Sequence, residues 1–61
     1  MYIAKDAHGS RNIYLTVYEG RSVWGDDRSL AQQFDTAEEA VTAGKEAMPS
    51  GMEDRVVSER A

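Results

Sequence analysis

A complete helix signal lies between Thr36 and Pro49, and it constrains how the rest of the chain can fold. Thr36 and Glu39 stand three residues apart, the spacing of a capping box, in which the two side chains satisfy N–H groups at the helix start. Pro49 cannot continue a helix and restricts the residue before it. The sequence therefore predicts a helix over about residues 37–48, roughly 18 Å long at about 1.5 Å per residue.

The inner side of this helix consists of small apolar residues at helical spacing. They are Ala37, Ala40, Val41, Gly44, Ala47 and Met48. Small residues allow the helix axis to lie close to a sheet, and a helix of this length is only marginally stable alone in water. A sheet must therefore supply the other half of the core.

The segment before the helix predicts short strands joined by turns. Residues 12–18 are the clearest strand, because β-branched and aromatic residues alternate along them. One face carries Ile13, Leu15 and Val17, and the other carries Tyr14, Thr16 and Tyr18. Residues 1–5 are expected to pair with this strand as an antiparallel hairpin across the Asp, Gly and Ser of residues 6–10.

Three further segments complete the expected sheet. Residues 22–24 can extend a third strand, and the alternation in residues 30–34 predicts an edge strand over about 29–34. Residues 55–58 form a last short strand. The predicted fold class is α+β: a small antiparallel sheet of three to four strands packed on one helix, in the order β-β-(β)-α-(β). The 61 residues form a single domain, 1–61.

The composition argues against catalysis. The chain has no cysteine and a single histidine, His8, so it lacks disulfides, thiolate metal sites and the ligand set of a zinc site. His8 and Ser10 share one turn without a positioned acid, which a catalytic triad requires. Asp26 and Asp27 are adjacent in a turn that lacks the spacing of a cation loop. We expect no catalytic residue, no metal and no cofactor, and the protein is predicted not to be an enzyme.

The charge of the chain indicates the kind of partner. The net charge is −4, and most of the acids follow residue 25. A negative field repels phosphate backbones and attracts basic surfaces, which disfavours direct nucleic-acid binding. The sequence shows no long apolar run and no apolar core of a signal peptide, so a cytoplasmic protein without a membrane segment is expected.

Two surfaces are candidates for partner binding. The first is an acidic surface. It lies on the helix, on the turn after the third strand and on the residues just before the helix start. It comprises Asp26, Asp27, Asp35, Glu38, Glu39 and Glu46. The second is the tyrosine face of the sheet, where Tyr14 and Tyr18 can serve as anchors, because tyrosine combines an apolar body with a polar tip. Trp24 is predicted to be a core residue.

Trp24 is followed by the Ala31-x-x-Phe34 spacing and by the helix start from Thr36 to Ala40. With this pattern, residues 24–48 resemble tiny proteins of phages and mobile elements. A subset of these proteins are anti-CRISPR proteins, which bind host surveillance complexes and block DNA recognition. The resemblance implies a non-enzymatic inhibitor that docks its acidic surface on a basic host protein or ribonucleoprotein complex. It transfers no binding residue to this chain.

Two alternatives use the tyrosine face. Lys5, Arg11 and Arg21 lie near the tyrosines, and bases stack on aromatic rings, so a nucleic-acid binder is one alternative. The other is a self-associating structural domain. A core of this size supplies only about 3–5 kcal/mol, and a homodimer would add the support that disulfides give other small proteins.

Overall fold

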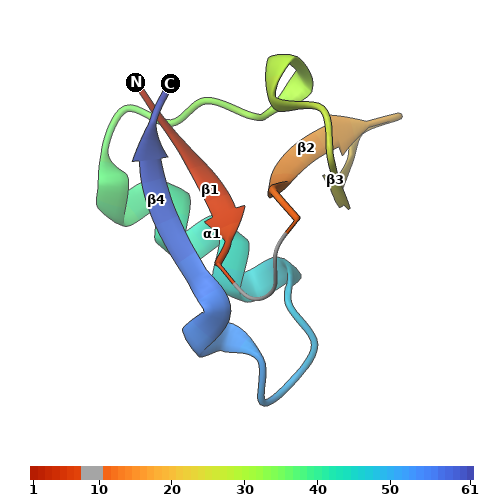
Figure 1. The fold of residues 1–61 in the computed structure, drawn as a ribbon, viewed down its shortest axis with the longest axis vertical. Helices are drawn as coiled ribbons and strands as arrows, with labels where there is room; N and C mark the ends of the chain where they lie inside the picture. The colour runs from red at the N-terminus through yellow and green to blue at the C-terminus, as the bar shows by residue number, and fades with distance from the viewer. Residues whose placement is uncertain (8–10) are drawn as a thin grey trace.

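A four-stranded antiparallel sheet lies against one helix in the computed structural model, which describes residues 1–7 and 11–61 (Figure 1). The order of strands across the sheet is β3-β2-β1-β4. The elements in chain order are β1 (Tyr2–Asp6), β2 (Ile13–Tyr18), β3 (Arg21–Gly25), η1 (Arg28–Leu30), α1 (Ala37–Ala47), η2 (Glu53–Arg55) and β4 (Val56–Arg60), where η marks a 3₁₀ helix. The predicted α+β class and the small single domain are confirmed. His8 and Ser10, the pair considered for a triad, lie outside the described residues.

The helix begins where the sequence predicts. The backbone N–H of Glu39 donates to the Thr36 hydroxyl over 3.1 Å, and that hydroxyl donates to Oε1 of Glu39 over 3.1 Å. The glutamate therefore reaches back to the threonine side chain, a local variant of the capping box. The helix ends at Ala47, one residue before the predicted end, and the N–H of Met48 closes the last turn on the carbonyl of Lys45.

The core lies between α1 and the sheet. Its fully covered cluster consists of Ala4, Leu15, Ala40 and Val56. Trp24 packs against this cluster, and its indole N–H donates to the carbonyl of Ala47 over 3.3 Å. This bond satisfies one of the free carbonyls at the helix end, which confirms Trp24 as a structural residue. The apolar face predicted for β2 is covered only in part, because Val17 is 49% exposed.

Gly44 allows α1 to approach the sheet closely. A Cβ built on Gly44 would lie 2.5 Å from Cγ1 of Val56 and 3.2 Å from Cβ of Ala4. Such distances leave no room for a methyl group without movement of the neighbours. The helix therefore packs on β1 and β4 through the backbone of this residue.

The edge strand expected over residues 29–34 does not form, and residues 28–30 form the η1 turn instead. The third strand is β3, over Arg21–Gly25, which includes the segment expected at residues 22–24. The Asp27 carboxylate accepts the N–H of Ser29 over 3.0 Å and its hydroxyl over 2.6 Å, which holds the chain in a turn.

Residues 31–34 fill the gap between two diverging strands. β1 and β2 pair only at Lys5↔Tyr14 and Asp6↔Ile13, and beyond this point they separate (Figure 1). The N–H of Gln32 donates to the carbonyl of Leu15 in β2, while Phe34 exchanges two backbone bonds with Tyr2 in β1. The alternation seen in the sequence thus belongs to an extended segment that bonds to both strands, and not to the edge of the sheet.

The first and last strands are neighbours. β4 pairs with β1 through five residue pairs, from Tyr2↔Arg60 to Asp6↔Val56. The N–H of Ala61 donates to the carbonyl of Met1 over 3.0 Å, so the two ends of the chain lie together (Figure 1). The expected last strand of residues 55–58 corresponds to β4 and extends two residues further.

The turn between β2 and β3 contains a strained residue. Glu19 has a φ of 51° and Gly20 a φ of 76°, so both central residues of this two-residue loop are left-handed. A hairpin loop with two positive φ values matches the twist of its strands and favours Asn-Gly over Glu-Gly. Glu19 therefore adopts a conformation that an L-residue with a long side chain rarely takes.

Replacing Glu19 by asparagine should raise the free energy of unfolding by about 0.5–1 kcal/mol, because asparagine tolerates the left-handed region. Urea unfolding measures this as a higher midpoint with an unchanged slope. Glu19→Gln is the matched control, since it removes the same charge without that tolerance. An equal gain in both variants would assign the effect to charge and not to the backbone.

Candidate functional site

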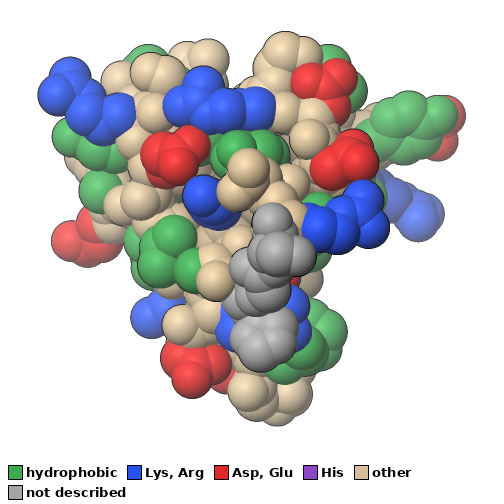
Figure 2. Space-filling model, in the orientation of Figure 1, with side chains coloured by type: hydrophobic (Ala, Val, Ile, Leu, Met, Phe, Trp, Pro, Cys, Tyr) green, Lys and Arg blue, Asp and Glu red, His purple; other side chains and the backbone are tan. Residues whose placement is uncertain are grey.

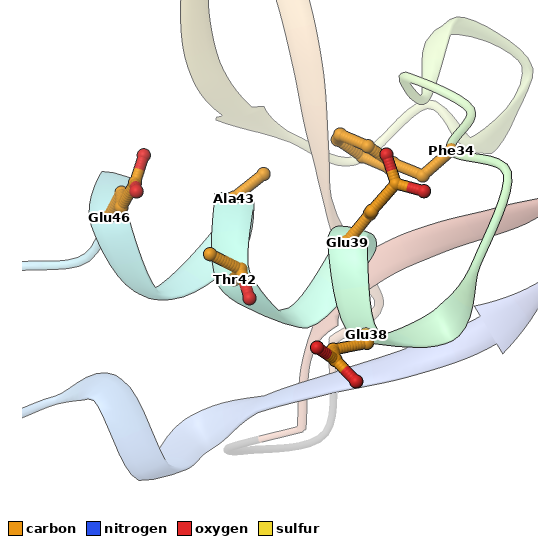
Figure 3. Close-up of a pocket in the computed structure, with 6 residues that line it drawn as sticks. All are labelled: Phe34, Glu38, Glu39, Thr42, Ala43 and Glu46. Carbon is orange, nitrogen blue, oxygen red and sulfur yellow. The ribbon is translucent and has the colours of Figure 1, made fainter.

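The three helix glutamates named as partner-binding residues line one open hollow. The hollow has a volume of about 270 Å³ and lies beside α1 (Figure 3). Its lining consists of Phe34, Glu38, Glu39, Thr42, Ala43 and Glu46. All three glutamates are exposed, and the Phe34 ring is partly buried against the core. The hollow therefore combines an apolar floor with a carboxylate rim.

The glutamates of the hollow do not have the same orientation. In Figure 3, Glu39 and Glu46 project on the side of the Phe34 ring, with Ala43 between them. These three residues are separated by four and three positions, so they share one face of the helix. Glu38 projects to the opposite side in the same view. The space next to the ring is thus bordered by Glu39, and the small Ala43 side chain leaves it open toward Glu46.

A second hollow continues the first. It has a volume of about 350 Å³ and is lined by Ser22, Gln32, Ala43, Glu46 and Ala47. Ala43 and Glu46 belong to both hollows, and we call the two together the acidic groove. The groove lies between α1 on one side and the residues of β3 and the 31–34 segment on the other. Oε1 of Gln32 is enclosed and has no hydrogen-bond partner among the described residues.

The three aspartates named with the glutamates lie outside the groove. Asp26 forms an exposed ion pair with Arg11 over 3.4 Å. Asp27 is occupied in the η1 turn, where it accepts two bonds from Ser29. Asp35 is exposed and directly precedes the helix cap. The structure therefore divides the predicted acidic surface, and only its helix glutamates line a common hollow.

The prediction of Tyr14 as a binding anchor is wrong. Tyr14 is 6% exposed, because β2 is an inner strand and Tyr14 stands between Lys5 of β1 and Gly25 of β3. Tyr18 stands at the end of the hairpin and is 65% exposed. Alternation along β2 placed both tyrosines on one face, but it did not indicate that the middle of this face is covered.

Charged residues on the open face of the sheet are paired with one another. Arg28 Nε donates to Oε2 of Glu59 over 3.0 Å, and Lys5 Nζ lies 3.6 Å from Oε1 of the same residue. The hydrogen bond from Arg28 is the main cause that lowers the pKa of Glu59 below its usual value, so this carboxylate stays ionised in mild acid. Figure 2 views the molecule from this side and shows acidic and basic side chains interspersed.

Glu38, Glu39 and Glu46 lack the ion-pair partners that Glu59 has among the described residues. Within residues 1–7 and 11–61, no ion pair involves any of the three. Their charge is therefore directed to solvent or to a partner and is not neutralised by the domain itself.

Neither a metal centre nor a membrane segment is found in the part of the chain that the structure describes. There, no group of three or more His, Cys, Asp or Glu residues is arranged to hold a metal ion. In the same residues, no helix has the length and apolar character needed to cross a bilayer.

Comparison of the chain with protein-family models, with curated proteins and with solved structures gave no match. The geometry and charge of the acidic groove therefore carry the functional inference.

Proposed function

We propose that the protein is a non-enzymatic binding domain that docks the acidic side of α1 on a basic surface of another protein. The observation that carries this proposal is the acidic groove, where three glutamates without an ion pair among the described residues line one hollow together with a partly exposed phenylalanine. A partner with arginine or lysine side chains would neutralise these carboxylates and cover the apolar floor.

The charge of the molecule supports a basic protein over a nucleic acid. The net charge is −4, and the groove adds a local concentration of carboxylates. Phosphate backbones are repelled by such a surface, whereas basic proteins are attracted and associate faster. The tyrosine face is a weaker alternative, because Tyr18 is the one exposed tyrosine among the residues that the structure describes.

The sharpest form of the proposal is an inhibitor of a CRISPR effector. Residues 24–48 resemble small phage proteins that include anti-CRISPR proteins, and this resemblance is its support. CRISPR effectors hold nucleic acids in positively charged channels, which are suitable targets for a carboxylate-bearing surface. Occupation of such a channel would prevent the effector from binding its target DNA.

The double variant Glu38→Lys/Glu46→Lys should abolish docking while the fold survives, because both side chains are exposed and neither forms an ion pair within the described residues. The measurement is the concentration of protein that half-inhibits target DNA binding by assembled CRISPR effectors of several types in a gel-shift assay. We expect the wild-type protein to inhibit at least one type and the variant to need at least tenfold more protein.

The matched control is Glu19→Lys/Asp54→Lys, at two exposed positions outside the groove. Each double variant brings the net charge from −4 to neutrality, so overall charge is the same in both. The control should stay within about twofold of the wild-type protein. Equal losses in the two variants would exclude the groove as the binding site, and no inhibition of any effector type would exclude the CRISPR form of the proposal.

A further inference from the structure

We infer that the acidic groove recognises one arginine side chain, presented by an extended segment of the partner, with its guanidinium stacked on Phe34 and paired with Glu46. This inference rests on the proposed function and specifies the chemistry of the partner. It follows from the shape of the first hollow, the orientation of its carboxylates and the continuation of the groove past Gln32.

The first hollow has the size and walls that suit a single long side chain. Its volume of about 270 Å³ is below the range of about 300–1,000 Å³ that is typical of sites for drug-sized ligands. Glu39 and Glu46 project on the same side of α1 as the Phe34 ring, with Glu39 next to the ring and Glu46 farther along the helix, beyond the small Ala43 (Figure 3). A cation between the ring and Glu46 would occupy the part of the hollow that Ala43 leaves open.

Arginine fits these walls better than lysine does. Its guanidinium is planar and weakly hydrated, so it can stack on an aromatic face and still donate in its plane to a carboxylate. Lysine carries a compact, strongly hydrated charge that matches the carboxylates but not the ring. Glu46 makes no hydrogen bond or ion pair within the described residues, whereas Oε1 of Glu39 already accepts from Thr36. Glu46 is therefore the main carboxylate for the guanidinium.

The second hollow suits an extended backbone on one side of that arginine. It continues directly from the first through Ala43 and Glu46 and leads to Gln32 and Ser22. The enclosed Oε1 of Gln32 has no donor among the described residues, and a buried acceptor without a donor is costly. An acceptor in the lining favours an extended segment, whose backbone N–H groups can donate, over a helix, whose N–H groups are bonded internally.

The test is a titration of the ¹⁵N-labelled full chain with an acetylated, amidated heptapeptide that has one arginine between Gly-Ser-Gly flanks. Two further peptides carry lysine or citrulline at that position, and citrulline has the shape of arginine without its charge. We expect saturable shifts of the Phe34, Ala43 and Glu46 amides with the arginine peptide. The lysine peptide should bind at least threefold more weakly, and the citrulline peptide should cause no saturable shift.

Two variants assign the contacts. Phe34→Leu keeps an apolar floor but removes the ring, so it should abolish the preference for arginine over lysine. Glu46→Gln removes the charge and should weaken arginine binding at least threefold, while Glu19→Gln, outside the groove, should leave it unchanged. The dispersion of the amide spectrum checks folding, and if Phe34→Leu does not fold, Glu46→Gln and the citrulline peptide decide the matter.

Equal binding of the arginine and citrulline peptides, or shifts that leave out Phe34, would overturn the inference. If the arginine peptide causes no shifts while Glu38→Lys/Glu46→Lys still loses its inhibition of an effector, arginine recognition is excluded and the docking function stands. If that double variant keeps its inhibition, the docking function fails on its own test, separately from the peptide result.

Discussion

Replacing Arg55 by methionine is expected to unfold most of the protein. Arg55 Nε donates to Oδ1 of Asp6 over 3.1 Å, and Nη2 donates to Oδ2 over 2.7 Å, so the pair is bidentate. The carboxylate belongs to a residue that is only 7% exposed. Removing one member of a buried ion pair costs about 3–5 kcal/mol, because the remaining carboxylate then lacks the bidentate guanidinium. A domain of this size has about that much net stability in total.

The measurement is urea unfolding followed by circular dichroism. Arg11→Met is the matched control, because it makes the same substitution in a pair whose side chains are 76% and 71% exposed. Exposed pairs contribute little, so the control should lose no more than about 0.5 kcal/mol. A loss below about 1 kcal/mol in Arg55→Met would show that the Asp6 pair does not hold β1 to the end of η2. Asp6→Leu/Arg55→Met should recover part of the loss, since both charges are then removed.

Gly44→Ala should lower the free energy of unfolding by about 1–3 kcal/mol, although alanine is the better helix former by about 1 kcal/mol. The added methyl group would lie 2.5 Å from Cγ1 of Val56, which forces the helix away from the sheet. Thermal and urea unfolding measure the change. Thr42→Ala, on the exposed side of the same helix, should instead be neutral or stabilising by a few tenths of a kcal/mol.

A double-mutant cycle tests the cause of the Gly44 effect. Val56→Ala removes the methyl group that blocks the new Cβ, so the two substitutions should compensate each other. Gly44→Ala/Val56→Ala should be more stable than the sum of the single effects by at least about 1 kcal/mol. Simple additivity would mean that contact with Val56 is not what excludes alanine from this position.

The helix was predictable because its signals are local. Thr36 and Glu39 cap it within one turn, Pro49 stops it, and its inner stripe of small residues can be read from spacing alone. The close approach of the helix to the sheet at Gly44 is what a stripe of small residues allows. Its distance to Val56 was not predictable, since the two residues meet only when β4 closes the sheet.

The sheet was less predictable because its shape depends on distant residues. The alternation in residues 30–34 predicted a strand, but it could not show that β1 and β2 diverge and leave a gap for this segment. The Asp27-x-Ser29 pattern is a turn signal that would have separated η1 from that strand. Burial of Tyr14 likewise follows from strand order, which places β2 inside the sheet.

The candidate site was predictable in its charges and not in its shape. Glu38, Glu39 and Glu46 lie on the helix at positions that the sequence places outside the apolar stripe. The groove also needs Ser22, Gln32 and Phe34, which reach the helix only through the fold of β3 and the 31–34 segment. The small Ala43 and Ala47 side chains are the sequence signal for a hollow beside these charges.

The pairing of β1 with β4 has a kinetic consequence. The β2–β3 hairpin and the capped helix depend on contacts between near neighbours, but the Asp6–Arg55 pair joins residues 49 positions apart. Loop-closure entropy opposes contacts of this kind until much of the chain is ordered, and it grows with the logarithm of loop length. Topologies with many distant contacts fold more slowly than their size suggests. We therefore expect the slow step in folding to be the pairing of β4 with β1, which completes the sheet and the core together.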